Sequence, residues 1–245
     1  MNIMSYELTK LELYGYQKGV SFDEPSHTYY YKNRTMTSVT TAVSNCFPRF
    51  DRGGNISIEL AKKKGITVKE LKAQWKAKAE LGTEVHSWCE YFVNGCATTP
   101  EVYSSEALKY AEIVPEFVKG VFDLSNVLYA EFPVYNGKFS VAGTCDLLVY
   151  DPIEDCIDIY DWKTNDTIYS PGVKFGKYGF DRLCGVPDTN YWHYALQLSV
   201  YKYILTQYGF KVGKLRLLHI TPESQQVIDL PYLSDEALIV LEMNL

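Results

Sequence analysis

The feature that most constrains the fold of this chain is a block of three strand-like segments near its middle. Between 127 and 164, runs rich in β-branched and aromatic residues alternate with polar residues, and Asn136-Gly137 and Asp151-Pro152 interrupt them. An Asn-Gly pair between such runs is a strong signal for a two-residue hairpin turn. The block therefore predicts three consecutive antiparallel strands, VLYAEFPVY, KFSVAGTCDLLVY and CIDIYDWKT.

Helical patterns stand on both sides of this block. Thr67 and Glu70 match a capping box and open a helix that runs to about Val93, where Asn94-Gly95 ends it. Segment 164–190 is polar, glycine-rich and aromatic, and we expect a long functional loop whose Tyr and Phe side chains can stack bases. Further elements are expected as helices at 105–122 and 191–209, as strands at 214–221 and 225–230, and as a terminal helix after these.

The N-terminal segment has a pattern of its own. Aromatic and β-branched residues alternate around Lys32-Asn33-Arg34, which predicts a β-hairpin. Thr37 or Ser38 can cap a short helix through Val43. We therefore expect an N-terminal β-hairpin and helical extension over 1–66, followed by a single globular core over 67–245.

Composition excludes several classes of protein. With 47% hydrophobic and 22% charged residues, the chain can form one large globular domain or two small ones, and it is not disordered, collagenous or a coiled coil. Its six cysteines form no CxxC pair, which indicates neither a zinc site nor a disulfide framework. No run of eighteen apolar residues and no signal-peptide pattern occurs, so we expect a soluble, cytoplasmic protein without a membrane partner.

The charge of the chain is unevenly distributed. The formal net charge is −6, but segment 32–80 holds eleven Lys and Arg against four Asp and Glu. A run of this kind is either a solvated helix face or a surface that contacts nucleic-acid phosphates. If it binds DNA, the lysines from Lys62 to Lys78 would contact phosphates. The alternative path for DNA follows Lys174, Lys177 and Arg182 in the long loop.

The third strand segment ends in charged residues. Asp161 and Lys163 share one face of the strand and Trp162 points to the other, because successive side chains alternate. Asp146, in the preceding strand, can lie beside Asp161, because neighbouring strands are about 4.8 Å apart. Two carboxylates so close repel each other unless a cation joins them, and Mg²⁺ prefers carboxylate oxygen. The alternative is that Asp161 and Lys163 form an exposed ion pair at the edge of the sheet. The apolar run before Asp161 favours a buried site instead.

Four short motifs then follow one another in a particular order. They are GTEVH at 82–86 on a predicted helix, GTCD at 143–146 and DWK at 161–163 on strands, and QLSVY at 197–201 on a later helix. This arrangement resembles the PD-(D/E)XK nuclease superfamily and, within it, the RecB-like, phage-type exonuclease branch that includes the mitochondrial genome maintenance exonuclease. The resemblance implies an α/β fold with a restriction-endonuclease-like core, in which helices flank a mixed sheet.

The resemblance also implies roles for individual residues. His86, Asp146 and Asp161 would be metal ligands, and the backbone carbonyl of Trp162 would contribute to the same site. Lys163 would be catalytic, together with the two aspartates. Lysine beside a bound metal can stabilise charge that develops in the transition state or orient a water.

The helical candidates have alternative interpretations. Gln197 and Tyr201 match the family's QxxxY motif and lie one helical turn apart on a shared face, where ordinary packing explains Tyr201 equally well. By the resemblance, both would lie near the site or the DNA and would take part in catalysis. His86 follows Gly82 by one turn, and this glycine would let the helix approach the sheet closely. Glu90 lies on the same helical face and is a further candidate for the site. The alternative is that it is solvated or only packs against its neighbours.

The resemblance implies one or two Mg²⁺ or Mn²⁺ ions as cofactor. Mn²⁺ should be at least as well accepted, because histidine is a softer ligand than Mg²⁺ prefers. Relatives often carry a glutamate at the position of Glu131, which we expect to support the ligands. CRISPR-adaptation relatives hold an iron–sulfur cluster with cysteines beyond the QxxxY motif. No cysteine follows Cys184 here, so we expect no cluster.

The expected function is that of a metal-dependent DNA exonuclease acting on single-stranded DNA or DNA ends in replication, recombination or repair, in a bacterial or phage-infected host cytosol. No GxxxxGK[ST] loop occurs, so unwinding would need a separate helicase or a replication or recombination protein. Two alternatives remain open: a structure-specific or defence endonuclease with the same site, and a catalytically silent nuclease fold that binds DNA.

Overall fold

The structure is a computed structural model, and it describes the chain except for residues 1–12, 14, 17–18, 24, 27, 52, 96–102, 124 and 174. Arg52 of the basic segment, Cys96 and Lys174 of the alternative DNA path therefore lie outside the described residues. The described cysteines are free thiols.

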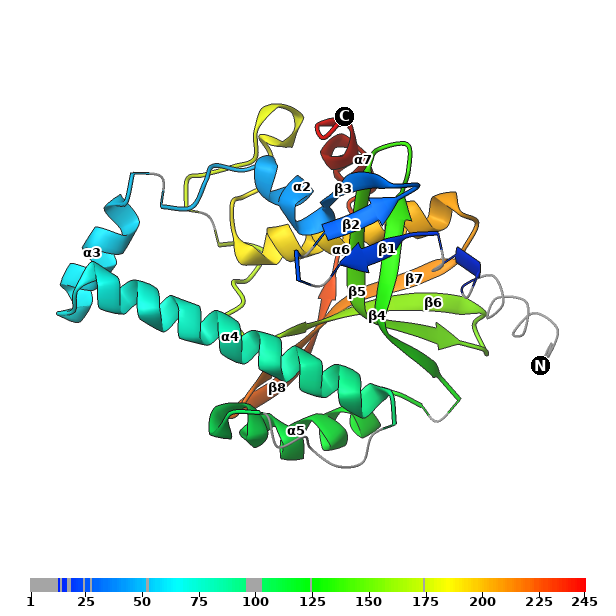
Figure 1. Cartoon of the computed structure of the whole chain (residues 1–245), viewed down its shortest axis with the longest axis horizontal. Coiled ribbons are helices and arrows are strands. Elements are labelled where there is room, and N and C mark those ends of the chain that lie inside the picture. The colour runs from blue at the N-terminus through cyan, green and yellow to red at the C-terminus, as the bar shows by residue number, and fades with distance from the viewer. Residues whose placement is uncertain are drawn as a thin grey trace.

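The fold is a mixed eight-stranded sheet flanked by helices, which confirms the predicted α/β class (Figure 1). The strands follow one another in space as β1-β2-β3-β5-β6-β7-β8, and β4 pairs with β5. The β3–β5 and β6–β7 pairs are parallel and the others antiparallel. The strand bounds are Ser21–Asp23 (β1), Thr28–Tyr31 (β2), Arg34–Ser38 (β3), Val127–Asn136 (β4), Val141–Asp151 (β5), Cys156–Lys163 (β6), Val212–Thr221 (β7) and Ser224–Leu230 (β8).

Helices cover the sheet on two sides and divide the core in two. Leu148 and Ile159 pack with apolar residues of α2, α6 and α7, whereas Leu147 and Trp162 pack with those of α4 and α5. Adjacent strand residues enter different cores because successive side chains alternate. No described helix is both long and apolar enough to cross a bilayer. The helix bounds are Val39–Asn45 (α2), Asn55–Lys64 (α3), Val68–Val93 (α4), Ser105–Val121 (α5), Asn190–Gln207 (α6) and Ser234–Glu242 (α7).

Local signals in the sequence produce the expected helix start and N-terminal hairpin. In the capping box of α4, the Thr67 hydroxyl accepts from the Glu70 N–H at 3.2 Å, and the Glu70 carboxylate accepts from the Thr67 N–H at 2.7 Å. Between β2 and β3, Lys32 and Asn33 have φ of 48° and 63°. Positive φ at both turn residues matches the twist of the strands, which explains why Asn33 suits this turn.

The turn between β4 and β5 differs from the two-residue turn that Asn136-Gly137 predicts. Asn136 pairs with Val141, so four residues, 137–140, form the loop. The Asn136 side chain accepts hydrogen bonds from the N–H groups of Lys138 and Phe139, and the Phe139 ring is buried. The hairpin is confirmed, but burial of Phe139 and this local hydrogen bonding outweigh the preference for the tighter turn.

Part of the basic segment projects from the body of the molecule. We call residues 55–80, which comprise α3 and the first half of α4, the arm (Figure 1). Its buried side chains are few: Ser57 and Ala61 in α3 and Leu71 in α4. The sequence did not predict α3 as a separate helix. Its apolar positions are sparse and its last turn is Lys62-Lys63-Lys64, so no buried stripe marked it.

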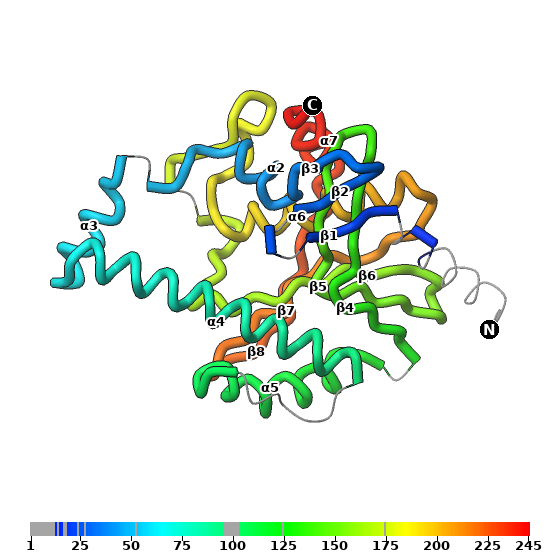
Figure 2. Tube along the Cα trace, viewed as in Figure 1, coloured from blue at the N-terminus to red at the C-terminus, as the bar shows by residue number. Residues whose placement is uncertain are grey.

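The long loop confirms the expectation of little regular structure over 164–190. It contains a short 3₁₀ helix at Asp181–Leu183 and an isolated bridge between Tyr178 and Pro187. Figure 2 shows this segment running beside α2, and the Phe180 N–H donates to the Cys46 carbonyl at 2.8 Å. Two segments more than a hundred residues apart in sequence thus border each other.

The β4–β5 loop yields a test of packing. Phe139→Ala removes a buried ring and leaves a cavity, so we expect the free energy of unfolding to fall by about 3 kcal/mol in urea denaturation. The control is Lys138→Ala at the exposed neighbouring position, which removes only an ammonium 5.0 Å from the centre of the Phe139 ring and should lower stability by about 0.5–1 kcal/mol. Equal stability of the two variants would show that the ring contributes nothing to the core.

Candidate active site

The candidate site lies where the ladder on one edge of β5 is interrupted. β4 pairs with one edge of β5 along most of its length. On the other edge, β3 pairs with Val141 and Ala142, and β6 pairs from Leu147 onward. The stretch 143–146 therefore has no strand partner on that edge. Backbone groups left open in this way need other hydrogen-bond partners, and the gap gives polar side chains access to the middle of the sheet.

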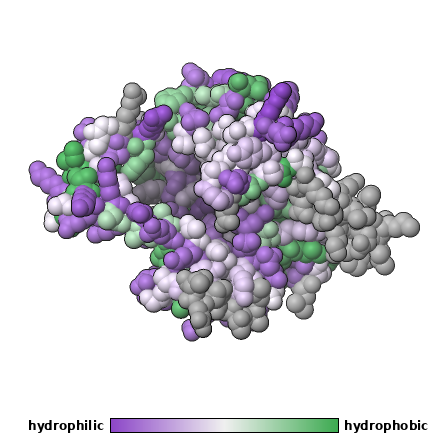
Figure 3. Space-filling view, viewed as in Figure 1, coloured by the Kyte–Doolittle hydropathy of each residue, from purple (hydrophilic) through white to green (hydrophobic). Residues whose placement is uncertain are grey.

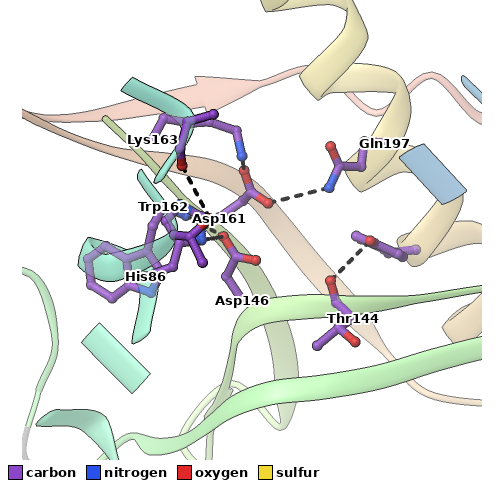
Figure 4. Close-up of polar contacts among 10 residues, drawn as sticks. His86, Thr144, Asp146, Asp161, Trp162, Lys163 and Gln197 are labelled. Carbon is purple, nitrogen blue, oxygen red and sulfur yellow. Dashed lines mark hydrogen bonds and ion pairs between the residues drawn. The ribbon is translucent and has the colours of Figure 1, made fainter. Parts of the chain in front are cut away.

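Asp146 and Asp161 face each other across this gap. Extending the register in which Leu147 pairs with Tyr160 sets Asp146 opposite Asp161. The Asp146 Oδ2 accepts a hydrogen bond from the Trp162 N–H at 2.9 Å, so a side chain replaces the missing ladder bond. The adjacency of the two carboxylates, which strand geometry predicted, is present (Figure 4).

The charges of the site are strongly coupled. Burial raises the pKa of Asp161 from its ordinary value to about 6, with Asp146 adding to the shift and Lys163 opposing it. Burial likewise raises the pKa of Asp146. Lys163 forms an ion pair with Asp161 from the same strand face, and its ammonium lies 4.7 Å from the centre of the Tyr194 ring. Although burial alone would lower the pKa of Lys163, Asp161 and Asp146 raise it. Lys163 is therefore held as a cation.

His86 reaches the same site from α4. Its Nδ1 lies 3.2 Å from the Asp146 Oδ2, and it makes a hydrogen bond to the backbone of Trp162. Burial, followed by the charge of Lys163, lowers the pKa of His86 to about 4. The imidazole is neutral at neutral pH, the form in which histidine binds metals. The Trp162 ring points into the core beneath α4 and α5, as alternation predicted.

A further carboxylate, Glu131, stands in β4 opposite Asp146. The pairs on either side of it, Ala130 with Leu147 and Phe132 with Cys145, place it in register, but its φ of 47° breaks the ladder there. Left-handed backbone is uncommon for such a residue and is found at functional sites. Burial raises the pKa of Glu131 to about 8, followed by Asp146, Glu90 and Asp161. Glu131 and Glu90 thus add acidic groups near the two aspartates.

Gln197 and Tyr201 approach the gap from α6. The Gln197 Nε2 lies 3.5 Å from the Asp161 Oδ1, and the Tyr201 hydroxyl donates to the Thr144 carbonyl at 3.0 Å. The Thr144 hydroxyl also lies 2.9 Å from the Tyr29 hydroxyl of β2. Tyr201 is buried, so its ring packs in the core while its hydroxyl bonds to the backbone at the gap. Sequence reasoning did not single out Thr144 or Tyr29.

Tyr194 is another residue of the site that sequence reasoning did not single out. It lies beneath Lys163, and its hydroxyl donates to the Asn165 Oδ1 at 2.8 Å. Its position three residues before Gln197, on the same helical face, was the available signal.

Two glycines of the motifs have different surroundings. A Cβ at Gly143 would lie 2.7 Å from the Tyr201 hydroxyl oxygen and 2.9 Å from its ring, closer than side chains pack. Glycine here lets α6 approach β5 closely enough for Tyr201 to reach Thr144. A Cβ at Gly82 would lie 3.3 Å from the Thr164 Oγ1, so the proposed close approach of α4 is present but less tight.

Most of these residues, although not His86, line an open cavity of about 420 Å³. Its floor carries the acidic groups and Lys163, and its walls come from the start of α2 and from α6. Figure 4 shows the side chains of Asp146, Asp161 and Lys163 pointing toward one another, with Gln197 extending from α6. The predicted site residues, widely separated in sequence, are therefore brought together.

The donor groups are suited in kind to a divalent cation. Carboxylate oxygens and a neutral imidazole are ligands of Mg²⁺ and Mn²⁺, and the surplus of acidic groups over the single ammonium favours a further positive charge. The described residues contain no set of three or more His, Cys, Asp or Glu side chains arranged to hold a metal ion. Instead, the Asp161 carboxylate is paired with Lys163, and the Asp146 carboxylate accepts a hydrogen bond from the Trp162 N–H.

Comparison with known proteins finds structural likeness only. No family model and no curated protein matches the sequence. The crystal structure of SSO0001 aligns over 100% of this chain and 85% of that chain, with a TM-score of 0.41 and 16% identity. A "Putative exonuclease" from Eubacterium rectale aligns over 67% of this chain and 64% of that one, with a TM-score of 0.42 and 19% identity. This chain thus spans less than two thirds of the Eubacterium rectale structure.

The close approach at Gly143 provides a test of the site's construction. In Gly143→Ala, the new methyl group meets the buried Tyr201 ring, so we expect a loss of stability of about 1–3 kcal/mol in thermal or urea unfolding. Gly185→Ala is the matched control, because a Cβ there meets no atom within 4 Å. If Gly143→Ala is as stable as Gly185→Ala, α6 does not pack on β5 as described.

Proposed function

We propose that this chain is a divalent-metal-dependent DNA exonuclease that hydrolyses phosphodiester bonds. The observation that carries the proposal is the meeting of Asp146, Asp161 and Lys163 at the gap in the sheet, with His86 beside Asp146. A largely buried lysine beside two carboxylates has little value as a stabilising feature, because burying charge is costly. Such a cluster in an open cavity is typical of a catalytic site.

The site residues would have two kinds of role, metal binding and positioning of the phosphate or water. Asp146, Asp161, His86 and the Trp162 carbonyl would hold one or two Mg²⁺ or Mn²⁺ ions. When bound there, the metal would lower the pKa of a water molecule and neutralise charge on the phosphate. Lys163 is the remaining cation, and it would donate to a phosphate oxygen or orient the attacking water once its ion pair with Asp161 is exchanged for the metal.

The surrounding residues would keep this arrangement in place. Gln197 donates toward Asp161 and would fix the orientation of that carboxylate. Tyr201 ties α6 to the Thr144 carbonyl, beside Asp146. Glu131 lies in β4 on the other side of Asp146, and it would ionise when a metal binds, because a nearby cation favours the charged carboxylate. Gln197 and Tyr201 would thus act through the ligands rather than on the phosphate.

Two observations favour nucleic acid as substrate. The described lysines of the arm, including Lys62, Lys63 and Lys64, are exposed and would contact phosphates along the route to the cavity. The exposed phenylalanine and tyrosine side chains of the long loop would stack on bases. Bases are available for stacking only where strands are separate, so single-stranded DNA or frayed ends are the preferred substrate. A separate helicase or recombination protein would supply unwound strands.

Digestion of DNA tests this proposal directly. We expect the protein to degrade end-labelled linear DNA with Mg²⁺ or Mn²⁺, to leave covalently closed circular DNA intact, and to stop when EDTA is added. Lys163→Ala and Asp161→Ala should each lower the rate on the order of 10²–10³-fold, and the double variant should be little worse, because groups that act as a unit are not additive.

The matched control for these variants is Lys202→Ala. Lys202 is also partly buried beside a tyrosine ring, but it bonds to Gly213 away from the cavity, and its removal should leave cleavage unchanged. Cleavage of the circle would identify an endonuclease with the same site. DNA binding without cleavage by the wild-type protein would identify a catalytically silent fold, and full activity in Lys163→Ala would remove this site from consideration.

The arm gives a separate prediction about binding. Replacing Lys62, Lys63 and Lys64 with Gln should reduce the slope of log affinity against log salt by about 2, because each contact on a single strand contributes about 0.7. Fluorescence anisotropy over a salt series measures this slope. Replacing the exposed Lys109 and Lys119 of α5 instead should not change it. An unchanged slope in the arm variant would make the arm a solvated helix face.

A further inference from the structure

A second cavity lies outside the site described above. It has a volume of about 790 Å³ and opens between the end of α2, α3 and the long loop. Figure 3 shows the surface hollowed in this region, between the arm and the rest of the molecule. The volume is within the range of pockets that hold small organic molecules.

Aromatic side chains line this cavity, and most of them are open to solvent. Phe50, Phe175 and Tyr169 line it and are 70%, 56% and 39% exposed, respectively. Phe47 forms a buried wall, and its ring lies 4.2 Å from that of His193. Phe175 packs edge-on against Tyr169, and Phe50 against Trp75, yet all three side chains remain exposed. Exposed apolar side chains gathered around one cavity are typical of a binding surface.

One wall of the cavity, that of the long loop around Tyr169, is held in place before any ligand binds. Asn190, at the start of α6, accepts from the Tyr169 N–H at 3.1 Å and donates to the Thr167 carbonyl at 2.8 Å. The Trp192 indole N–H donates to the Pro171 carbonyl at 3.2 Å. Three hydrogen bonds thus fasten this part of the long loop to α6, which lowers the entropy lost when a ligand is bound.

Polar groups are also positioned at the bottom of the cavity. Thr189 is only 4% exposed, and its hydroxyl has no hydrogen-bond partner among the described residues. It occupies the N-cap position of α6 but makes no capping bond there. Next to it, the His193 Nε2 lies 2.9 Å from the Asp188 Oδ1. A buried hydroxyl without a partner costs free energy unless a ligand or a water supplies one.

This cavity and the candidate active site are connected by two helices. The start of α2, at Ser38 and Val39, lines the active-site cavity, and Ser44 at its other end lines the aromatic cavity. The seven residues of α2 span about 10 Å, which corresponds to about three stacked nucleotides at 3.4 Å each. On α6, His193 faces the aromatic cavity, and Tyr194 faces the active site.

We propose that the aromatic cavity binds one unstacked base of a single strand whose scissile phosphate lies in the active site. This inference rests on the proposed function and names its substrate class. Phe50, Phe175 and Tyr169 would stack on the base, and the Thr189 hydroxyl would hydrogen-bond to its edge. A base paired in a duplex cannot enter, so the cavity selects single strands.

The charges around the cavity fit a base better than a free phosphate. Lys63 and Lys177 on its border are offset by Glu59 and by Asp188, which is paired with His193. The cavity therefore has little net charge, whereas the neighbouring arm is strongly basic. In this arrangement the lysines contact the phosphate chain, and the aromatic side chains hold the base that branches from it.

The test compares two strands that differ only in their bases. Fluorescein-labelled single-stranded oligothymidylate and an abasic oligomer of the same length and charge are titrated with protein in EDTA, so that no cleavage occurs. The ratio of the two affinities measures base binding alone. Phe50→Ala and Phe175→Ala should each reduce this ratio by about 5- to 150-fold, the effect of losing one stacked base. Thr189→Val should also reduce it.

Four control variants complete the design. Phe50→Tyr and Phe175→Tyr keep the ring and should preserve the ratio, which separates stacking from a loss of folding. Tyr232→Ala removes an exposed ring that lies on neither cavity and should also preserve it. The arm variant with Gln at 62, 63 and 64 should weaken both oligomers equally.

The outcomes separate this proposal from the proposed function. An unchanged ratio in Phe50→Ala and Phe175→Ala, or no preference of the wild-type protein for the strand with bases, overturns base binding even if the protein cleaves DNA. A reduced ratio in a protein that does not cleave DNA supports base binding and leaves the nuclease proposal overturned on its own test.

Discussion

The structure depends on one local interruption, the absence of a strand partner for residues 143–146 on one edge of β5. A continuous ladder there would satisfy the backbone and leave no room for polar side chains. Because the ladder is interrupted, Asp146 bonds to the Trp162 N–H and Tyr201 bonds to the Thr144 carbonyl. The hydrogen bonds that complete the sheet are therefore made by the same residues that build the candidate site.

The interruption also explains how residues from both sides of the sheet meet. His86 belongs to α4, which packs over one core, and Gln197 belongs to α6, which packs over the other. An unbroken sheet would separate them by a layer of backbone. The gap lets His86 contact Asp146 and lets Gln197 approach Asp161. Gly143 contributes by leaving space for the Tyr201 ring.

Burial of several carboxyl groups dominates the electrostatics of this site. Burial raises the pKa of Asp146, Asp161 and Glu131, and repulsion from Asp146 adds to the shifts of Asp161 and Glu131. Lys163 relieves only part of this repulsion. Any additional cation at the cavity would stabilise the ionised carboxylates, so the energetic cost of assembling them is offset by binding. His86 adds no charge to the site at neutral pH, because burial and the charge of Lys163 lower its pKa to about 4.

The sequence by itself determined the central strands, most of the helices and the direction in which the strand side chains point. Alternation placed Asp161 and Lys163 on one face and Trp162 on the other, and the capping box set the start of α4, because both signals act over a few residues. Only the tertiary structure decided the four-residue loop that buries Phe139, the φ of Glu131, and the approach of Tyr29 to Thr144. The aromatic cavity likewise joins segments around Phe50 and Phe175 that have no local relation. These features arise from packing between distant segments, and no short stretch of sequence contains the partner that sets them.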